Sequence, residues 1–191
     1  MNNDRITKIQ VAEDIRTRYI NDERIKTLNT GRLGSTIAVA GILLFIMQDI
    51  YILGFHELLP WRITGIIPFI LFLLLSFSIF KKYPALIIPF HAISLTGLIV
   101  MMCGIIAVLF SSSNCTGPYI YPAETGLIVD IFAVFIFASG ARRFIPVIIP
   151  VPLLVLISLL LLKCDIPLKD FATLSNPLLV AFIVSVYSVY Q

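Results

Sequence analysis

Charged residues are scarce in this 191-residue chain: they make up 13% of it, whereas hydrophobic residues make up 59% and the mean hydropathy is +0.99. Such a composition excludes a water-soluble globular domain, in which about a quarter of the residues are charged. The charges are also unevenly spread, because 12 of the 25 lie in the first 32 positions. The sequence therefore predicts two parts: a polar N-terminal segment, residues 1–32, and a membrane domain, residues 33–191.

The sequence also lacks known catalytic and nucleotide-binding motifs. The sequence has two His and three Cys, and it carries no nucleophile-elbow, zincin, Walker A or dinucleotide-binding motif. We therefore expect no enzymatic activity, no metal and no cofactor in this chain. The net charge of +3 comes from basic residues that stand singly or in pairs beside apolar runs, which argues against a nucleic-acid partner. The charged first 32 residues also lack the apolar stretch of a cleavable leader.

Six apolar stretches follow the charged segment. They lie at residues 33–53, 63–80, 85–110, 125–141, 144–162 and 171–191. Each approaches the length of about 20 residues that one bilayer crossing needs, and a crossing segment of this kind must be helical to pair its own backbone. The sequence thus predicts an all-α membrane protein with six transmembrane helices, whose first partner is the lipid bilayer.

The segment before the first span predicts an amphipathic cytosolic helix. Its Ile, Leu and Tyr residues recur mostly three to six positions apart among acidic and basic ones. Such a helix would lie on the membrane surface or pair with a neighbouring subunit, and the alternative is a solvated charged arm. Asn29, Thr30, Gly31 and Gly34 are expected to break this pattern where the chain enters the bilayer.

The distribution of basic residues predicts the orientation. If the N-terminus is cytoplasmic, that side holds eleven Lys or Arg, including the pairs Lys81–Lys82 and Arg142–Arg143. The opposite side holds three, Arg62, Lys163 and Lys169. Because basic loops are retained in the cytoplasm, both termini are expected there.

Small residues and prolines indicate how the helices should pack. Close approaches are expected at Gly34, Ala38 and Gly41 of the first span and at Gly97 and Gly104 of the third. Prolines in the second, third and fifth stretches are expected to kink those helices near their ends.

Acidic and aromatic residues on the expected outer side form the candidate site. Asp49 and Asp130 lie within spans, where a carboxylate is costly and is a functional candidate by default. With Glu57, Tyr121 and Glu124 they could form an outward-facing pocket for a small cation or polar ligand. In the alternative, the aromatic residues belong to the interfacial belt, and the acids reach headgroup water or pair with Arg62.

Histidine and cysteine give two further expectations. His91 stands alone, so a structural histidine is favoured over a metal or haem ligand. Cys115 and Cys164 fall in two connections on the outer side, where a disulfide could join them. The alternative is two free thiols too far apart to bond.

The arrangement resembles the six-helix N-terminal membrane domains (MASE-like sensor domains) of bacterial nucleotide cyclases, both diguanylate cyclases and class III adenylate or guanylate cyclases. The features that carry the likeness, besides the charged leading helix, are Pro60-Trp61-Arg62, Lys81-Lys82-Tyr83-Pro84, the segment 119–126, Arg142-Arg143-Phe144 and Asn176-Pro177. The resemblance implies a sensor or anchor in a bacterial inner membrane, usually a homodimer, whose sixth helix continues into a cytosolic output domain in cis. No output motif occurs before Gln191, so we expect a membrane portion of a longer protein or a stand-alone relic of one.

The function expected from the sequence is a sensory or anchoring module that couples an external or intramembrane cue to a cytosolic output. The alternative is a small multi-pass transporter or channel subunit. That alternative predicts that Asp49 and Asp130 face one another across a water-accessible path.

Overall fold

The computed structural model describes residues 3–54, 56–112, 120–163 and 168–190, and within these ranges it is almost entirely helical and contains no strand. The elements, in chain order, are α1 Asn3–Gln48, the π-helical turn η1 Asp49–Leu53, the 3₁₀ turn η2 His56–Leu58, α2 Leu59–Phe77, α3 Ile79–Lys82, the 3₁₀ turn η3 Pro84–Leu86, α4 Ile87–Ser112, α5 Ile120–Phe137, the 3₁₀ segment η4 Ser139–Phe144, α6 Ile145–Ile148, α7 Pro150–Lys163 and α8 Leu168–Tyr190.

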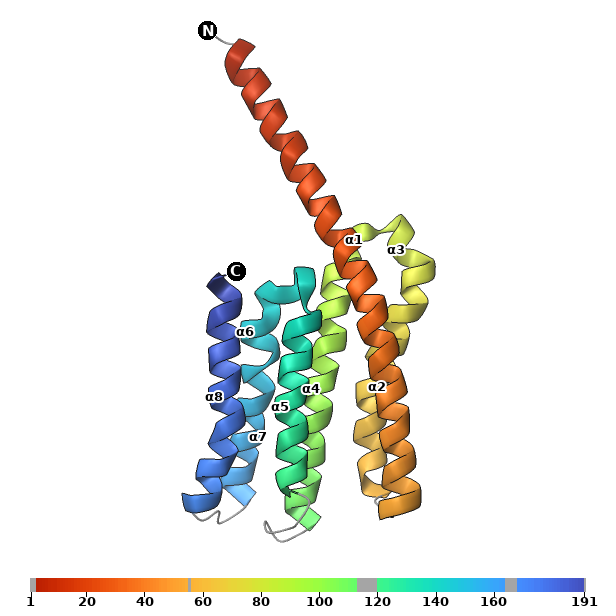
Figure 1. The fold of residues 1–191 in the computed structure, drawn as a ribbon, viewed down its shortest axis with the longest axis vertical. Coiled ribbons are helices and arrows are strands. Elements are labelled where there is room, and N and C mark those ends of the chain that lie inside the picture. Colours follow the sequence, from red (N-terminus) through yellow and green to blue (C-terminus); the bar gives the residue numbers. More distant parts are fainter. Residues whose placement is uncertain (1–2, 55, 113–119, 164–167, 191) are drawn as a thin grey trace.

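The long helices run side by side, up and down, in one bundle (Figure 1). Among the described residues, four helical segments are long and apolar enough to cross a membrane: Glu13–Leu53, His56–Phe77, Pro84–Phe110 and Ser139–Leu162. Two shorter apolar helices, Thr125–Phe137 and Leu179–Ser188, belong to α5 and α8. The C-terminal end of α8 lies at the end of the bundle from which the N-terminal half of α1 projects (Figure 1).

The first helix is longer than the sequence suggested. Residues 29–34, where the amphipathic pattern was expected to break, do not end the helix, because α1 runs unbroken from Asn3 to Gln48. A glycine inside a helix costs only about 1 kcal/mol relative to alanine, which packing against the bundle offsets. We call residues 3–26 the arm and residues 27–34 the joint. The expected boundary at residue 32 therefore falls within a continuous helix.

The core lies around α4, which packs against α1, α2, α5 and α7. Its Ile99 and Ile106 are fully buried, and most residues of α4 are apolar, as is typical of a central helix. In contrast, the apolar side chains of α1 and α7 are largely exposed on the outer faces of the bundle, for example Leu44 and Leu162. Such exposed apolar faces fit lipid contact.

Glycines mark the closest helix contacts, although not at every expected position. Gly104 lies directly against the Trp61 ring, and a Cβ at Gly97 would stand 3.0 Å from Pro68. Gly34 similarly packs on the Phe137 ring. The expectation for Gly41 is wrong, because a Cβ there would meet no atom within 4 Å. Position 41 faces an open space instead of a neighbouring helix.

Two helical segments are interrupted near their ends. The fifth apolar stretch divides into α6 and α7, and the second of these begins at Pro150. Proline lacks the amide that would continue the helical hydrogen bonds, which accounts for this break. The other break, at Ser78 between α2 and α3, involves no proline.

Candidate ligand cavity

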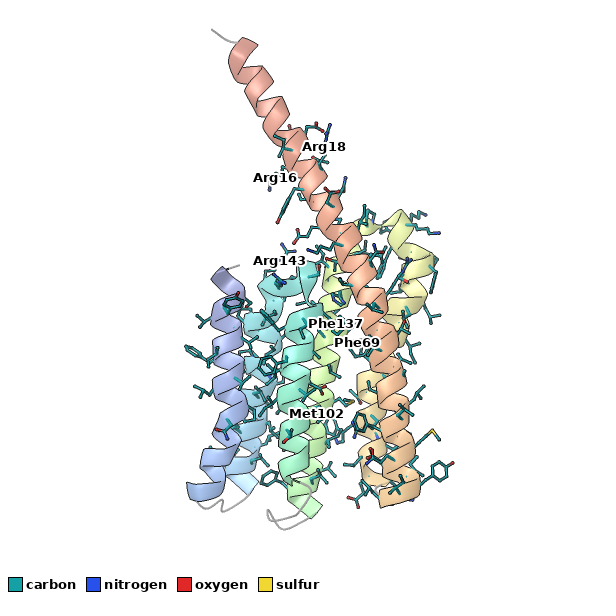
Figure 2. All side chains as sticks on the ribbon, viewed as in Figure 1. Arg16, Arg18, Phe69, Met102, Phe137 and Arg143 are labelled. Atoms are coloured by element: carbon teal, nitrogen blue, oxygen red, sulfur yellow. The ribbon has the colours of Figure 1, made fainter. Side chains whose placement is uncertain are left out.

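A partly open cavity of about 490 Å³ lies between α1, α2, α4 and α5. Its walls are mostly apolar, and Phe69, Met102 and Phe137, which belong to three different helices, are labelled in Figure 2. The α1 wall is formed by residues at three- or four-residue spacing, which places them on one helix face. These residues are Gly34, Ala38, Gly41, Phe45 and Gln48, and Asp49 of η1 follows them.

A buried ion pair closes the end of the cavity farthest from the arm. The Arg62 Nε donates a hydrogen bond to the Asp49 Oδ2 at 2.9 Å, and the two side chains are only 8% and 7% exposed. The Arg62 guanidinium also lies over the Phe45 ring, 4.8 Å from its centroid. Cation–π contact and charge pairing together hold the first turn of α2 against the end of α1.

Asp130 of α5 lines the same cavity, and the Arg62 charge interacts with it. It lies ten residues after Ile120, the first residue of α5, which is about 15 Å along the helix axis. The expected stretch 125–141 would have placed Asp130 only five residues from the start of its helix. Gln48 and Thr125 add two neutral polar side chains to this part of the wall. One guanidinium and two carboxylates are therefore gathered there.

The opposite end of the cavity reaches His91 and Phe137, next to the joint. The His91 ring is buried, donates from Nε2 to the Phe137 carbonyl oxygen at 2.7 Å, and packs against the Phe72 ring. Its Nδ1 is buried without a hydrogen-bond partner. Gly31 packs against both Phe72 and His91. This histidine thus connects α4 to the end of α5, consistent with a structural role.

The joint is fixed to the bundle by hydrogen bonds from two sides. The buried Thr27 Oγ1 accepts a hydrogen bond from the Gly140 amide of η4 at 3.0 Å. Arg32 donates to the Ser76 hydroxyl at 3.0 Å and to the Ser76 carbonyl at 2.5 Å, and it lies over the Phe77 ring. The arm beyond the joint is exposed at every described side chain from position 13 to 19.

Only part of the expected outer pocket is assembled. Asp49 and Asp130 line one cavity, whereas the exposed Glu57 lies on a second, more open groove between α2, α4 and α7. The side chains of Tyr121 and Glu124 lie outside the described part of the structure. Cys115 and Cys164 also lie outside it, so the expected disulfide between them stays a prediction. Cys103, in the described part, is a buried free thiol.

Sequence reasoning missed Phe45 and Gln48, although Phe45 lies four residues after Gly41 and Gln48 three residues after Phe45, which was a usable signal. It kept the pairing of the acids with Arg62 as an alternative, and the structure adopts that alternative for Asp49.

Within the described ranges, no three His, Cys, Asp or Glu side chains come together as metal ligands would. No protein-family model matches the chain, and neither a curated protein nor a solved structure shows significant similarity to it.

Proposed function

We propose that the chain is an integral membrane sensory and anchoring domain that crosses a bacterial inner membrane six times. The arm and the end of α8 lie on the cytoplasmic side in this proposal, where α8 passes the signal to an output domain in cis, a nucleotide cyclase by the resemblance described above. The chain itself binds and transmits without catalysis.

The observation that carries the proposal is the double role of α1. One face of α1, from Gly34 to Gln48, forms a wall of the cavity, and the same uninterrupted helix continues through the joint into the arm. A ligand can shift a conformational equilibrium only by binding one arrangement better than another. A ligand in this cavity contacts α1 directly. A change in the packing of α1 against the bundle is then transmitted along this continuous helix to the arm.

Grouping of basic residues supports the orientation. The arm, the basic end of α3 and η4 with Arg143 lie at the same end of the bundle (Figures 1 and 2). At the opposite end, the positive charge of Arg62 is neutralised by its pairing with Asp49. The excess of basic residues at the arm's end favours a cytoplasmic arm.

The arm also supports a homodimer. Ile15, Tyr19 and Ile25 are 62%, 69% and 58% exposed, so the apolar residues of the amphipathic pattern have no cover within one copy. We propose that the arms of two copies pair through these side chains. Disulfide cross-linking of Tyr19→Cys in membranes, with Thr17→Cys as the control on the same helix, tests the pairing, and equal cross-linking of both would contradict it.

Filling the cavity tests the signalling role. Gly41→Leu places a side chain into open space, whereas Ala40→Leu places the same side chain on the exposed neighbouring position of α1. Nitroxide labels at Thr17→Cys on the arm and Arg143→Cys on η4, in a chain without native cysteines, report the distance between arm and bundle by double electron–electron resonance.

We expect Gly41→Leu to shift this distance by about 2 Å or more, since helix displacements of 1–2 Å are typical of such transitions and a long arm amplifies them. Ala40→Leu should leave the distance unchanged. A folded Gly41→Leu variant with the parent distance distribution would refute the coupling.

A transporter or channel subunit is the second candidate, because Asp49 and Asp130 do line one cavity. The pairing of Asp49 with Arg62 argues against a freely hydrated ion path. Cation uptake into proteoliposomes that contain the purified chain, lost on Asp130→Asn, would favour this candidate over the sensor.

A further inference from the structure

We infer that the cavity between α1, α2, α4 and α5 binds a single-chain amphiphile with a positively charged head group, whose apolar chain lies along α1 and whose head meets Asp130. The inference rests on the proposed function, because it names the class of ligand that the sensory cavity would take.

The shape of the cavity favours an apolar chain. The α1 wall extends from Gly34 to Asp49, which is about 22 Å at 1.5 Å per residue. Between these ends the described lining consists of apolar side chains, chiefly Ile42, Leu98, Met101, Met102 and Ile105. The missing side chain at Gly41 keeps the middle open. Methionines adapt to ligands of irregular shape, so the two on α4 suit a flexible alkyl chain.

The charged side chains at one end of the cavity indicate which charge the head group of the ligand should carry. Asp49 and Arg62 neutralise each other through their 2.9 Å contact, so an ionised Asp130, the second carboxylate, leaves one negative charge in excess. The other polar side chains of this part, Gln48 and Thr125, are neutral, and His91 lies at the opposite end. A carboxylate among apolar walls is costly unless a cation accompanies it.

An anionic head group would meet two carboxylates and an arginine that is already paired. A cationic head group instead supplies a second positive charge for Asp130, whose interaction with Arg62 is shared with Asp49, and leaves the Asp49–Arg62 pair intact. The cavity is partly open and its walls are mostly apolar, which suits a ligand with an alkyl chain.

Binding of radiolabelled dodecylammonium to the full chain in phosphatidylcholine nanodiscs tests this inference, with laurate as the probe of equal chain length and opposite charge. Empty nanodiscs correct for partition into lipid. We expect saturable binding of dodecylammonium at least tenfold tighter than that of laurate, which corresponds to about 1.4 kcal/mol.

Substitutions test whether dodecylammonium binds in this cavity and at Asp130. Asp130→Asn should weaken dodecylammonium binding about tenfold or more, whereas Asp130→Glu, which keeps the charge, should retain it. Glu57→Gln is the matched control, because Glu57 is an acid outside this cavity, and it should bind as the parent does. Gly41→Leu should abolish binding by filling the space for the chain.

Equal binding of the two probes, or parent-like binding by a folded Asp130→Asn variant, would overturn the inference. If Asp130→Asn does not fold, the comparison of probes in the parent and the response of Gly41→Leu decide it. The arm distance separates the two proposals. Asp130-dependent binding with an immobile arm refutes the signalling role alone, and an arm that responds to Gly41→Leu without charge selectivity refutes the ligand class alone.

Discussion

The Thr27 hydroxyl accepts a hydrogen bond from the Gly140 amide at 3.0 Å, across 113 positions of sequence. The same hydroxyl donates to the Glu23 carbonyl one helical turn earlier, at 2.8 Å. Thr27 is fully buried, and a Cβ at Gly140 would collide with its oxygen. This contact fastens the base of the arm to the turn between α5 and α6.

Thr27→Val keeps the size and branching of the side chain but leaves the buried Gly140 amide without a partner. Loss of one partner of a buried hydrogen bond costs about 1–3 kcal/mol. We therefore expect faster amide hydrogen exchange in residues 139–144, measured by mass spectrometry in nanodiscs. Thr17→Val removes only a local bond to the Glu13 carbonyl on the exposed arm and should leave that exchange unchanged. Identical exchange in both variants would contradict this role of Thr27.

The Asp49–Arg62 pair should be needed for stability only as a pair. Asp49→Ala leaves the buried guanidinium uncompensated, and such a change destabilises a protein by about 3 kcal/mol or more. The double variant D49L/R62M, which removes both charges, should recover most of the loss. Asp14→Ala breaks the exposed Asp14–Arg18 contact of 3.0 Å and should cost about 0.5 kcal/mol or less. Detergent-induced unfolding followed by circular dichroism measures all three, and a stable Asp49→Ala variant would be the contrary result.

Gly104 and Gly41 were both expected at close helix contacts, but substitution by alanine should change the stability of the bundle in opposite directions. Gly104→Ala drives a methyl group into the Trp61 ring and should destabilise the bundle by about 1–3 kcal/mol, because overpacking forces neighbouring side chains off their positions. Gly41→Ala meets open space, and the better helix propensity of alanine should stabilise α1 by up to about 1 kcal/mol. Thermal unfolding in detergent provides the comparison. Equal melting temperatures for the two variants would show that the two sites do not differ in packing.

Orientation can be tested with an impermeant maleimide on intact cells, using a chain without native cysteines. Glu57→Cys is exposed in η2 at the end away from the arm and should react from outside. Lys82→Cys and Arg143→Cys, exposed at the arm's end, should react only after lysis, because basic turns remain in the cytoplasm. Labelling of the latter two in intact cells would invert the topology and place the charged end of the cavity at the cytoplasmic face.

The acidic residues show how far local sequence reasoning extends. Asp49 and Asp130 stand out because a carboxylate within an apolar run is rare, and both do line the cavity. Glu57 carries the same charge at the same end of the bundle, yet it lies on a different groove. Sequence position determines how far along a helix a residue lies, but not the direction in which the helix face points within the bundle. That direction separates Glu57 from the other two.

Glycines illustrate the same division. Gly34 and Gly41 have the same small-residue character on one face of α1, and the sequence treats them alike. In the structure Gly34 packs on Phe137, whereas Gly41 faces the cavity. The difference arises because α1 and α5 meet near the joint and leave room beside position 41. This difference depends on the tilt of α1 relative to α5, which cannot be deduced from the residues of either helix.

Composition and hydropathy alone determined that this chain is helical and that several of its helices suit a lipid environment, because the partition of side chains into lipid and the need to pair backbone groups there act on each segment independently. Only the tertiary structure decided that α1 is a single helix from the arm to the cavity, that Arg62 pairs with Asp49, and that Asp130 faces the same space. These features join segments far apart in the chain, and they depend on how each helix is rotated and tilted against its neighbours.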